Sequence, residues 1–346
     1  MKQLVIFILL IPITLVAQTG GKNAFPFLDL PYDARTGSLG RKLITIFDDD
    51  LHMGIQNPAA LNPSMDNSVG ISQALLASGI NHGMLAYAKD FANIGTGAIH
   101  LRYVAYGKMN RMDEFGQELG TFSAGDFVLG ASMGRIINSN LSIGASFNII
   151  WSQLESYGSF GISADIAGMY RSTDERTVVT AVVRNIGAQI KSYLPKQRAP
   201  LAIEPMIGFS HRLGHAPFRF SIIAQRLNKW DLSYNDPKAM PTLDPLTGAI
   251  IPVKRAGFGE KLGRHFIFQV ESLIGKIVRI RVAFDYNQRM EMLVQNRPGI
   301  GGFSFGAGLN FKRFAIDYGF YAYSTAGYHN LLTIRGNINT WRKGAK

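Results

Sequence analysis

Hydrophobic and polar residues alternate with a period of two along the C-terminal third of the chain. From 278 to 287, apolar side chains occupy every even position, and polar or small ones occupy every odd position. The stretches 314–323 and 332–340 repeat the pattern. This period is typical of a β-strand with one apolar and one polar face. A soluble sandwich also alternates in this way, so the rest of the chain has to distinguish it from a membrane barrel.

The alternation begins at Ser68 and predicts fourteen strands, an even number. Most of them are about ten residues long or longer, whereas strands of soluble sheets have roughly five or six. About ten tilted residues are needed to cross an outer membrane. The predicted strands are 68–75, 83–90, 95–107, 126–137, 141–152, 158–171, 177–187, 201–213, 217–228, 264–274, 277–289, 301–311, 314–323 and 329–341.

The connections between these strands alternate in length. The odd-numbered connections have 7, 18, 5, 13, 35, 11 and 5 residues, and the even-numbered ones have 4, 3, 5, 3, 2 and 2. Outer-membrane barrels have long extracellular loops and short periplasmic turns, which gives this parity when both barrel termini are periplasmic. Greek-key sandwiches have no such parity. We therefore predict an all-β fold, a 14-stranded antiparallel transmembrane β-barrel over residues 67–346.

The N-terminal part of the chain is different in kind. Lys2 followed by the apolar run 4–16 predicts a secretory signal peptide, residues 1–17, cleaved after Ala17. Residues 18–66 carry four prolines and an acidic triplet but no sustained alternation. We interpret them as a plug, or hatch, inside the barrel. The predicted location is the outer membrane of a Gram-negative bacterium, with both barrel termini in the periplasm.

The free-energy cost of placing a charge in lipid predicts which side chains face the lumen. A lysine or arginine facing lipid near the bilayer midplane costs roughly 2–4 kcal/mol, so charged positions should face the lumen. Many other lumenal positions are glycine, which marks close approach of another backbone and fits a plug. Paired lumenal charges such as Asp285 and Arg335 either guide a solute or hold the plug, and we favour the second role. The predicted lumen-facing charges are Arg102, Asp165, Arg279, Arg281, Asp285, Asp317 and Arg335.

The amino-acid composition limits the kinds of binding partner that the protein can have. The chain of 346 residues has no cysteine, which removes disulfide scaffolds, thiolate metal sites and cysteine nucleophiles. Its net charge is +12, but the basic residues are scattered and the chain is exported, so we expect no nucleic-acid partner. The positive charge instead fits contact with anionic outer-membrane lipids or lipopolysaccharide.

Catalytic sequence motifs are absent or lack the structural context that they require. Residues 302–306 match G-x-S-x-G, but a nucleophile elbow needs a strand-to-helix turn and the alternation here runs straight through Ser304. The chain has no S-x-x-K, phosphate-loop or H-E-x-x-H motif. The acidic triplet 48–50 has the oxygen ligands that calcium prefers, although a turn or helix-capping role fits it better. We predict no enzymatic activity, no metal and no cofactor.

Three stretches of the N-terminal segment resemble the hatch of FadL-like outer-membrane proteins. They are residues 33–40 (DARTGSLG), 48–50 (DDD) and 56–61 (QNPAAL). Within that family the chain is more similar to the Bacteroidota branch, the PorV and PorQ proteins of the type IX secretion system. Its length and residues 23–31 favour the PorQ type. The plug residues that carry the resemblance are Arg35, Gly40, Asp48, Asp49, Asn57, Pro58 and Ala59.

The resemblance implies a non-enzymatic barrel in a surface attachment complex, acting with PorZ, PorU and PorV-like partners on secreted cargo. Its docking surfaces would then be the loops 108–125 and 229–263, the second of which contains Trp230, Tyr234 and Phe258. The alternative is a FadL-like channel for hydrophobic small molecules. That role needs an apolar path through the lumen and a hatch that moves or a lateral opening. A general diffusion porin is disfavoured by the plug.

Overall fold

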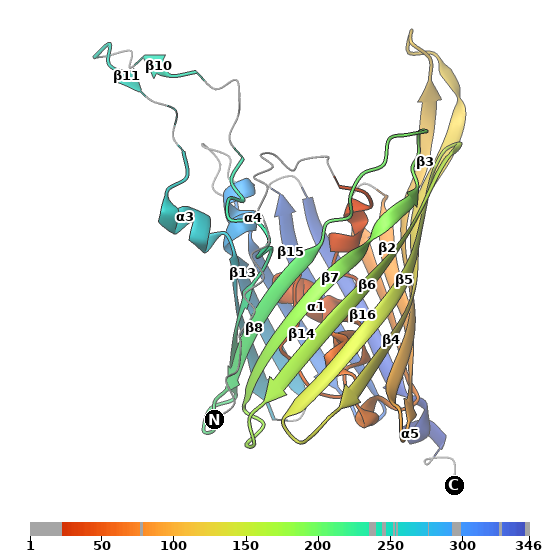
Figure 1. The fold of residues 1–346 in the computed structure, drawn as a ribbon, viewed down its shortest axis with the longest axis vertical. Helices are drawn as coiled ribbons and strands as arrows, with labels where there is room; N and C mark the ends of the chain where they lie inside the picture. The colour runs from red at the N-terminus through yellow and green to blue at the C-terminus, as the bar shows by residue number, and fades with distance from the viewer. Residues whose placement is uncertain are drawn as a thin grey trace, which may run out of the picture.

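Fourteen antiparallel strands form one closed barrel (Figure 1). The computed structural model describes residues 23–76, 79–234, 240–243, 247–251, 253, 255–275, 277–292, 299–324 and 327–342, so the predicted signal peptide lies outside the described residues. Each barrel strand pairs with the barrel strands before and after it, and the barrel closes where the first strand pairs with the last. The predicted fold class is confirmed. The barrel strands are β1 (Ser68–Leu76), β2 (Asn81–Phe91), β3 (Gly95–Met112), β4 (Glu118–Ile136), β5 (Leu141–Leu154), β6 (Tyr157–Arg171), β7 (Thr177–Lys191), β8 (Glu204–Arg212), β9 (Phe218–Ala224), β12 (Phe266–Ile274), β13 (Val278–Asp285), β14 (Phe303–Asn310), β15 (Phe314–Ser324) and β16 (Gly327–Asn337).

The outer surface of the barrel is apolar and its inner surface is polar or packed. On β12, Phe268 is 47% exposed whereas the next residue, Gln269, is 2% exposed. On β5, Phe147 is 49% exposed and Asn148 only 1%. An exposed apolar band on a closed barrel is what lipid contact requires, because closure of the sheet pairs the backbone groups of neighbouring strands.

One predicted loop is wrong. The stretch 108–125 is mostly strand, because β3 runs on to Met112 and β4 starts at Glu118. The two strands continue past a register shift between Ala105 and Lys108, where Gly107 adopts a positive φ of 77°. In Figure 1 this hairpin extends well beyond the rest of the wall. Both of its faces meet solvent there, so the period of two that marks a membrane strand is lost although pairing continues.

Three predicted strands are too long at their C-terminal ends. The strand predicted at 217–228 stops at Ala224 as β9, before Arg226, which adopts a positive φ of 53°. β13 stops at Asp285, whose carboxylate accepts a hydrogen bond from the backbone N–H of Gln288 (3.1 Å) and caps the helix α4 (Tyr286–Glu291). β16 stops at Asn337, and the helix α5 (Ile338–Arg342) follows. At β13 and β16, helix capping therefore ends the strand earlier than the alternation of apolar and polar residues predicts.

The N-terminal segment, residues 23–67, lies inside the barrel (Figure 1). It contains only short helices and turns, and we call it the hatch. None of the helices in the described residues is long and apolar enough to cross a bilayer. The hatch helices are η1 (Pro26–Asp29), α1 (Ala34–Ser38), α2 (Leu51–Gln56), η2 (Pro58–Ala60) and η3 (Pro63–Met65).

Glycines of the wall make room for the hatch. A Cβ atom at Gly144 of β5 would lie 2.2 Å from the carbonyl carbon of Pro58, and one at Gly319 of β15 would lie 2.2 Å from the carbonyl oxygen of Ala34. These are contacts with backbone, which cannot rotate away. The interpretation of the lumenal glycines as the site of a plug agrees with this geometry.

The two ends of the barrel differ. The long connection between β9 and β12 carries the two-stranded ribbon β10 (Thr242–Leu243) and β11 (Ile250–Ile251) and the helix α3 (Phe258–Gly263). It lies at the same end as the β3–β4 hairpin, and α5 lies at the opposite end (Figure 1). We call the α5 end the turn end, because the short connections 172–176 and 213–217 lie there.

Candidate functional site

The candidate site is the interface between the hatch and the barrel wall. Its centre is Arg35 on α1, which is 1% exposed. The helix begins at Asp33, whose side chain accepts a hydrogen bond from the N–H of Thr36 (2.8 Å). This cap fixes α1 so that the guanidinium of Arg35 reaches Asp48 (2.8 Å), Asp50 (3.1 Å) and Glu271 (3.0 Å). One arginine therefore ties two parts of the hatch to β12.

Glu271 is the matching centre on the wall. Besides Arg35, its carboxylate accepts from Arg281 of β13 (2.9 Å) and Arg219 of β9 (2.9 Å). The sequence prediction did not single out Glu271, although its alternation with Phe268 and Val270 assigns it to the lumen. A lone acidic residue among inward-facing arginines was the signal that could have found it.

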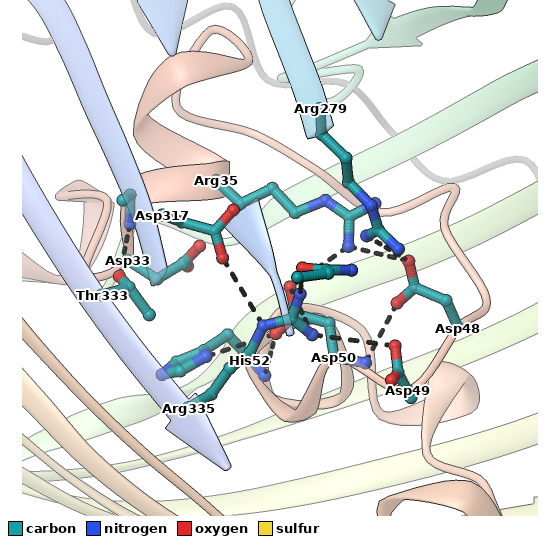
Figure 2. A network of polar contacts seen from close by, with 12 residues as sticks. Asp33, Arg35, Asp48, Asp49, Asp50, His52, Arg279, Asp317, Thr333 and Arg335 are labelled. Atoms are coloured by element: carbon teal, nitrogen blue, oxygen red, sulfur yellow. Dashed lines mark hydrogen bonds and ion pairs between the residues drawn. The ribbon is translucent and has the colours of Figure 1, made fainter. Parts of the chain in front are cut away.

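A chain of ion pairs continues from these two centres to β15 and β16 (Figure 2). Arg281 pairs with Asp317 (2.7 Å), and Arg335 lies 3.5 Å from both Asp317 and Asp50. Arg279 reaches Asp48 at 3.5 Å. We call this set the hatch lock. Its members are Arg35, Arg219, Arg279, Arg281, Arg335, Asp48, Asp49, Asp50, Glu271 and Asp317.

The hatch lock is balanced in charge, with five arginines and five carboxylates. Buried charges are costly unless they are paired and hydrogen-bonded. Removing one member leaves an uncompensated charge in the lumen, so the network strongly disfavours departure of the hatch. The plug-holding role predicted for the lumenal charges fits these contacts.

The acidic triplet is used inside the hatch. Asp50 accepts from the N–H of His52 (3.2 Å) and so caps α2, and its second partner is the His52 ring (3.3 Å). Burial alone would raise the pKa of Asp50, but Arg335, His52 and Arg35 hold it well below its usual value. Burial alone would lower the pKa of His52, but Asp50 raises it. In the described residues no cluster of histidine and carboxylate groups has the arrangement of a metal site.

A second set of contacts fixes the turn after α1. Arg41 pairs with Asp285 of β13 (3.3 Å), and Lys42 pairs with Glu204 of β8 (2.7 Å). Gly40 has a positive φ of 73°, and a Cβ there would lie 2.5 Å from Ile267 Cγ2. Only glycine fits this position without strain.

The remaining motif residues also have structural roles. Asn57 accepts from the N–H of Ala59 (3.0 Å) and donates to the carbonyl of Ile44 (2.7 Å), which holds the two halves of the hatch together. Ala59 accepts from the Ser142 hydroxyl of β5 (2.7 Å), and Pro58 lies against Gly144. These motif residues therefore seat η2 against the wall.

Three of the predicted lumenal charges lie outside the hatch lock: Asp285, which pairs with Arg41 of the hatch, and the two residues Arg102 and Asp165. Arg102 of β3 lies 5.4 Å from the centre of the Tyr32 ring and 3.5 Å from Asn148 Oδ1. Asp165 of β6 accepts from Ser146 (2.7 Å) and from the N–H of Asn185 (2.8 Å). The structure places both on the inner side, but in contact with neutral partners.

The other half of the lumen contains a large apolar cluster. Inward-facing side chains of β2, β3, β4 and β5 form one buried cluster with the hatch and with Leu201. Arg102 and Asp126 also lie on the inner side of these strands, but apolar side chains outnumber them, whereas the wall made by β12–β16 carries most of the hatch lock. We call this cluster the apolar half. Its wall members are Met84, Ala86, Ala88, Ala98, Val104, Val128 and Ile150, and its hatch members are Ala24, Phe25, Phe27, Leu28, Tyr32, Leu51, Ile55, Leu61 and Met65.

The wall is interrupted where this cluster reaches Leu201. Regular pairing of β7 with β8 stops at Arg184 and Glu204. Beyond it, within residues 79–234, a single bridge joins Ala188 to Pro200. Asn185 adopts a positive φ of 58°, and the β6–β7 register shifts between Ala164 and Ile166. A proline cannot donate to the ladder, so this edge is only weakly closed.

The predicted partner-docking residues are exposed. Trp230, Tyr234 and Phe258 are 49%, 78% and 71% exposed. The rings of Trp230 and Phe258 lie 5.2 Å apart, and the Trp230 carbonyl lies 3.2 Å from His265 Nε2. Trp230 and Phe258 thus form one anchored aromatic pair at α3.

Comparison with known proteins supports the fold. No protein-family model and no curated protein matches the sequence. Among solved structures, the toluene transporter TodX of Pseudomonas putida is similar over 88% of this chain and 98% of its own (TM-score 0.51, 12% identity). The toluene transporter TbuX of Ralstonia pickettii is similar over 90% and 99% (TM-score 0.52, 12% identity). A Pseudomonas aeruginosa FadL homologue covers 88% of this chain with a TM-score of 0.46 and 10% identity.

The fold is therefore that of the FadL-like outer-membrane β-barrels. The comparisons provide no support for the narrower resemblance to the PorV and PorQ branch. Membership of the type IX secretion system stays a prediction from the motifs.

Proposed function

We propose that the protein is an outer-membrane channel for small hydrophobic molecules. The observation that carries the proposal is the apolar half of the lumen, which is continuous from the inner faces of β2–β5 to Leu201 at the break in the wall. A hydrophobic solute gains by leaving water for such a surface. The charged half offers it no comparable benefit.

The hatch closes this path. Phe25, Phe27 and Tyr32 fill the apolar half, so a solute passes only when this part of the hatch shifts. Most contacts there are apolar packing, although Asp29 pairs with Lys42 and Arg226, whereas the opposite side of the hatch is held by the larger network of the hatch lock. Movement of residues 24–32 about a fixed α1 is therefore the least costly way to open the path.

The exit of a hydrophobic solute is the break between β7 and β8. Ala24 donates its N–H to the carbonyl of Pro200 (2.9 Å), so the start of the hatch covers the break from inside. Withdrawal of Ala24 from Pro200 and Leu201 would expose the apolar half to lipid. The toluene transporters TodX and TbuX share the fold in which we place this path.

Uptake of an apolar dye tests the proposal. A Gram-negative host producing the protein should take up N-phenyl-1-naphthylamine several-fold faster than the same host with an empty vector. Leu201→Asn puts a polar group of similar size in the path and should remove most of the gain. Ile203→Asn, two residues on and outside the apolar half, is the matched control. Uptake equal to that of the vector would refute the channel, and faster uptake of a sugar instead would indicate a diffusion porin.

A second candidate is the attachment role implied by the hatch motifs. The observation that favours it is the exposed aromatic group of the long β9–β12 connection, since aromatic side chains are enriched at protein interfaces. In a native host, deletion should release surface cargo, and Trp230→Ala with Phe258→Ala should do the same. Normal attachment of cargo in the deletion strain would end this candidate.

A further inference from the structure

A polar cavity of about 420 Å³ lies at the turn end, between the hatch and the wall. Its floor is the hatch stretch 45–48, and its sides are the ends of β6, β7, β8, β9, β12 and β13. It lies on the charged side of the lumen, away from the path proposed for hydrophobic solutes. Five arginines line it, namely Arg171, Arg176, Arg212, Arg219 and Arg279.

Three of the five arginines are already paired. Arg219 and Arg279 belong to the hatch lock through Glu271 and Asp48. Arg176 lies 3.9 Å from Asp174, and its guanidinium rests against Gly214. The cavity's carboxylates Asp48 and Asp174 are used in these pairs.

Arg171 and Arg212 are different. No ion pair connects either of them to a described residue. Arg171 is 93% buried, being 7% exposed, and its Nε has no hydrogen-bond partner in the described part of the chain. Its guanidinium lies 3.6 Å from the centre of the Phe47 ring, and the third carboxylate of the cavity, Glu175, is exposed on the turn without an ion pair to it.

An unpaired buried guanidinium is unfavourable, and a stacked aromatic ring compensates only part of the cost. A planar guanidinium fork matches the oxygens of a phosphate or carboxylate. The apolar side chains of the same cavity, Phe47, Leu213 and Leu273, leave space for an organic group beside the anion.

We propose that this cavity is a binding site for a phosphate-type oxyanion, either free or esterified to a small organic group, held by Arg171 and Arg212. The site is independent of the channel, because it shares no residue with the apolar half. It gives the protein a second ligand class at the mouth opposite the long loops.

Calorimetric titration of the purified full-length protein tests the site at low ionic strength. Inorganic phosphate should bind saturably, and both Arg171→Gln and Arg212→Gln should weaken binding about tenfold or more, as expected for loss of a charged hydrogen bond. Arg135→Gln removes the same charge from an exposed position at the turn end of β4 and should leave binding unchanged. Heat-dependent gel migration shows whether each variant is a folded barrel, and Arg212, which is exposed, provides a test even if Arg171→Gln misfolds.

Glycerol 3-phosphate separates the two sources of the anion. Tighter binding than inorganic phosphate indicates an esterified ligand, and equal or weaker binding indicates the free ion. Absence of saturable binding of both probes would overturn the proposal. So would equal weakening by all three arginine variants, because the effect would then be one of net charge.

Discussion

Replacing Arg35 by methionine should loosen the hatch and leave the barrel intact. The side chain keeps its approximate length but loses its charge, and three carboxylates lose their shared partner. The strands do not depend on Arg35 for their pairing. The perturbation therefore acts on the contact between hatch and wall.

The size of the destabilisation depends on the ion pairs that each carboxylate keeps after Arg35 is replaced. Removing one partner of a buried ion pair costs roughly 3–5 kcal/mol. Glu271 keeps Arg281 (2.9 Å), and Asp50 and Asp48 keep longer pairs of 3.5 Å with Arg335 and Arg279. We therefore expect the lower end, about 3 kcal/mol. That corresponds to an increase of about a hundredfold in the population of the open hatch.

The absence of cysteine makes this measurable. A single Ala60→Cys substitution places a thiol in η2, where Ala60 is fully buried against the wall. A thiol reagent reaches it only when the hatch opens, so the labelling rate reports the opening equilibrium. Arg35→Met should raise that rate about a hundredfold, since about 1.4 kcal/mol corresponds to a factor of ten.

Arg111→Gln is the matched control. It removes Arg111 of the β3–β4 hairpin from its exposed ion pair with Glu155, which lies between β5 and β6, and exposed pairs contribute little. If Arg35→Met folds as a barrel and is labelled at the parent rate, the hatch lock does not hold the hatch.

Three further outcomes are expected. Gly144→Ala should destabilise the hatch by roughly 1–3 kcal/mol through overpacking against Pro58, and so speed labelling of the thiol introduced by Ala60→Cys. Gly168→Ala, whose added Cβ meets no atom within 4 Å, should not change the labelling rate. Equal rates in the two variants would contradict the assigned contact. Phe268→Arg should lower the folded fraction in membranes at a cost of roughly 2–4 kcal/mol. Leu119→Arg, on the hairpin outside the apolar band, should be tolerated. Similar losses of folded protein in the two variants would refute the assignment of Phe268 to a lipid-facing band. Because the pKa of His52 is raised in the hatch, protonated His52 stabilises it fully below about pH 6.5 and less as the pH rises through the raised value. Labelling, corrected for thiol ionisation, should therefore accelerate with rising pH and lose this dependence in His52→Gln; an unchanged profile in that variant would show that another group titrates.

The alternation of side chains made much of the barrel predictable. The period of two is a local property, and the cost of a charge in lipid decides which face turns outward. Arg281 and Phe268 could thus be assigned to lumen and lipid from their positions alone. The prediction was wrong at the β3–β4 hairpin, because pairing beyond the membrane needs no alternation. It was also wrong after Asp285 and Asn337, where helices follow, and after Ala224, where β9 ends.

The candidate site was predictable only in part. Arg35, Asp48 and Asn57 were identified through a motif, and their partners were not. Glu271 could have been found as a lone acidic residue among inward-facing arginines, whereas Leu201 has no local feature that marks it. The break between β7 and β8 arises from a register shift inside predicted strands and from the segment 188–200, which the sequence predicts as a loop.

The sequence by itself determined a membrane barrel with an N-terminal segment too irregular to belong to its wall, because strand period and facing depend on neighbouring residues. Only the tertiary structure decided what that segment does. Closure of the barrel brings Glu271 within 3.0 Å of Arg35, which is 236 positions away, and sets a charged half of the lumen against an apolar one. Such pairings depend on the register and curvature of fourteen strands together, and no local pattern contains them.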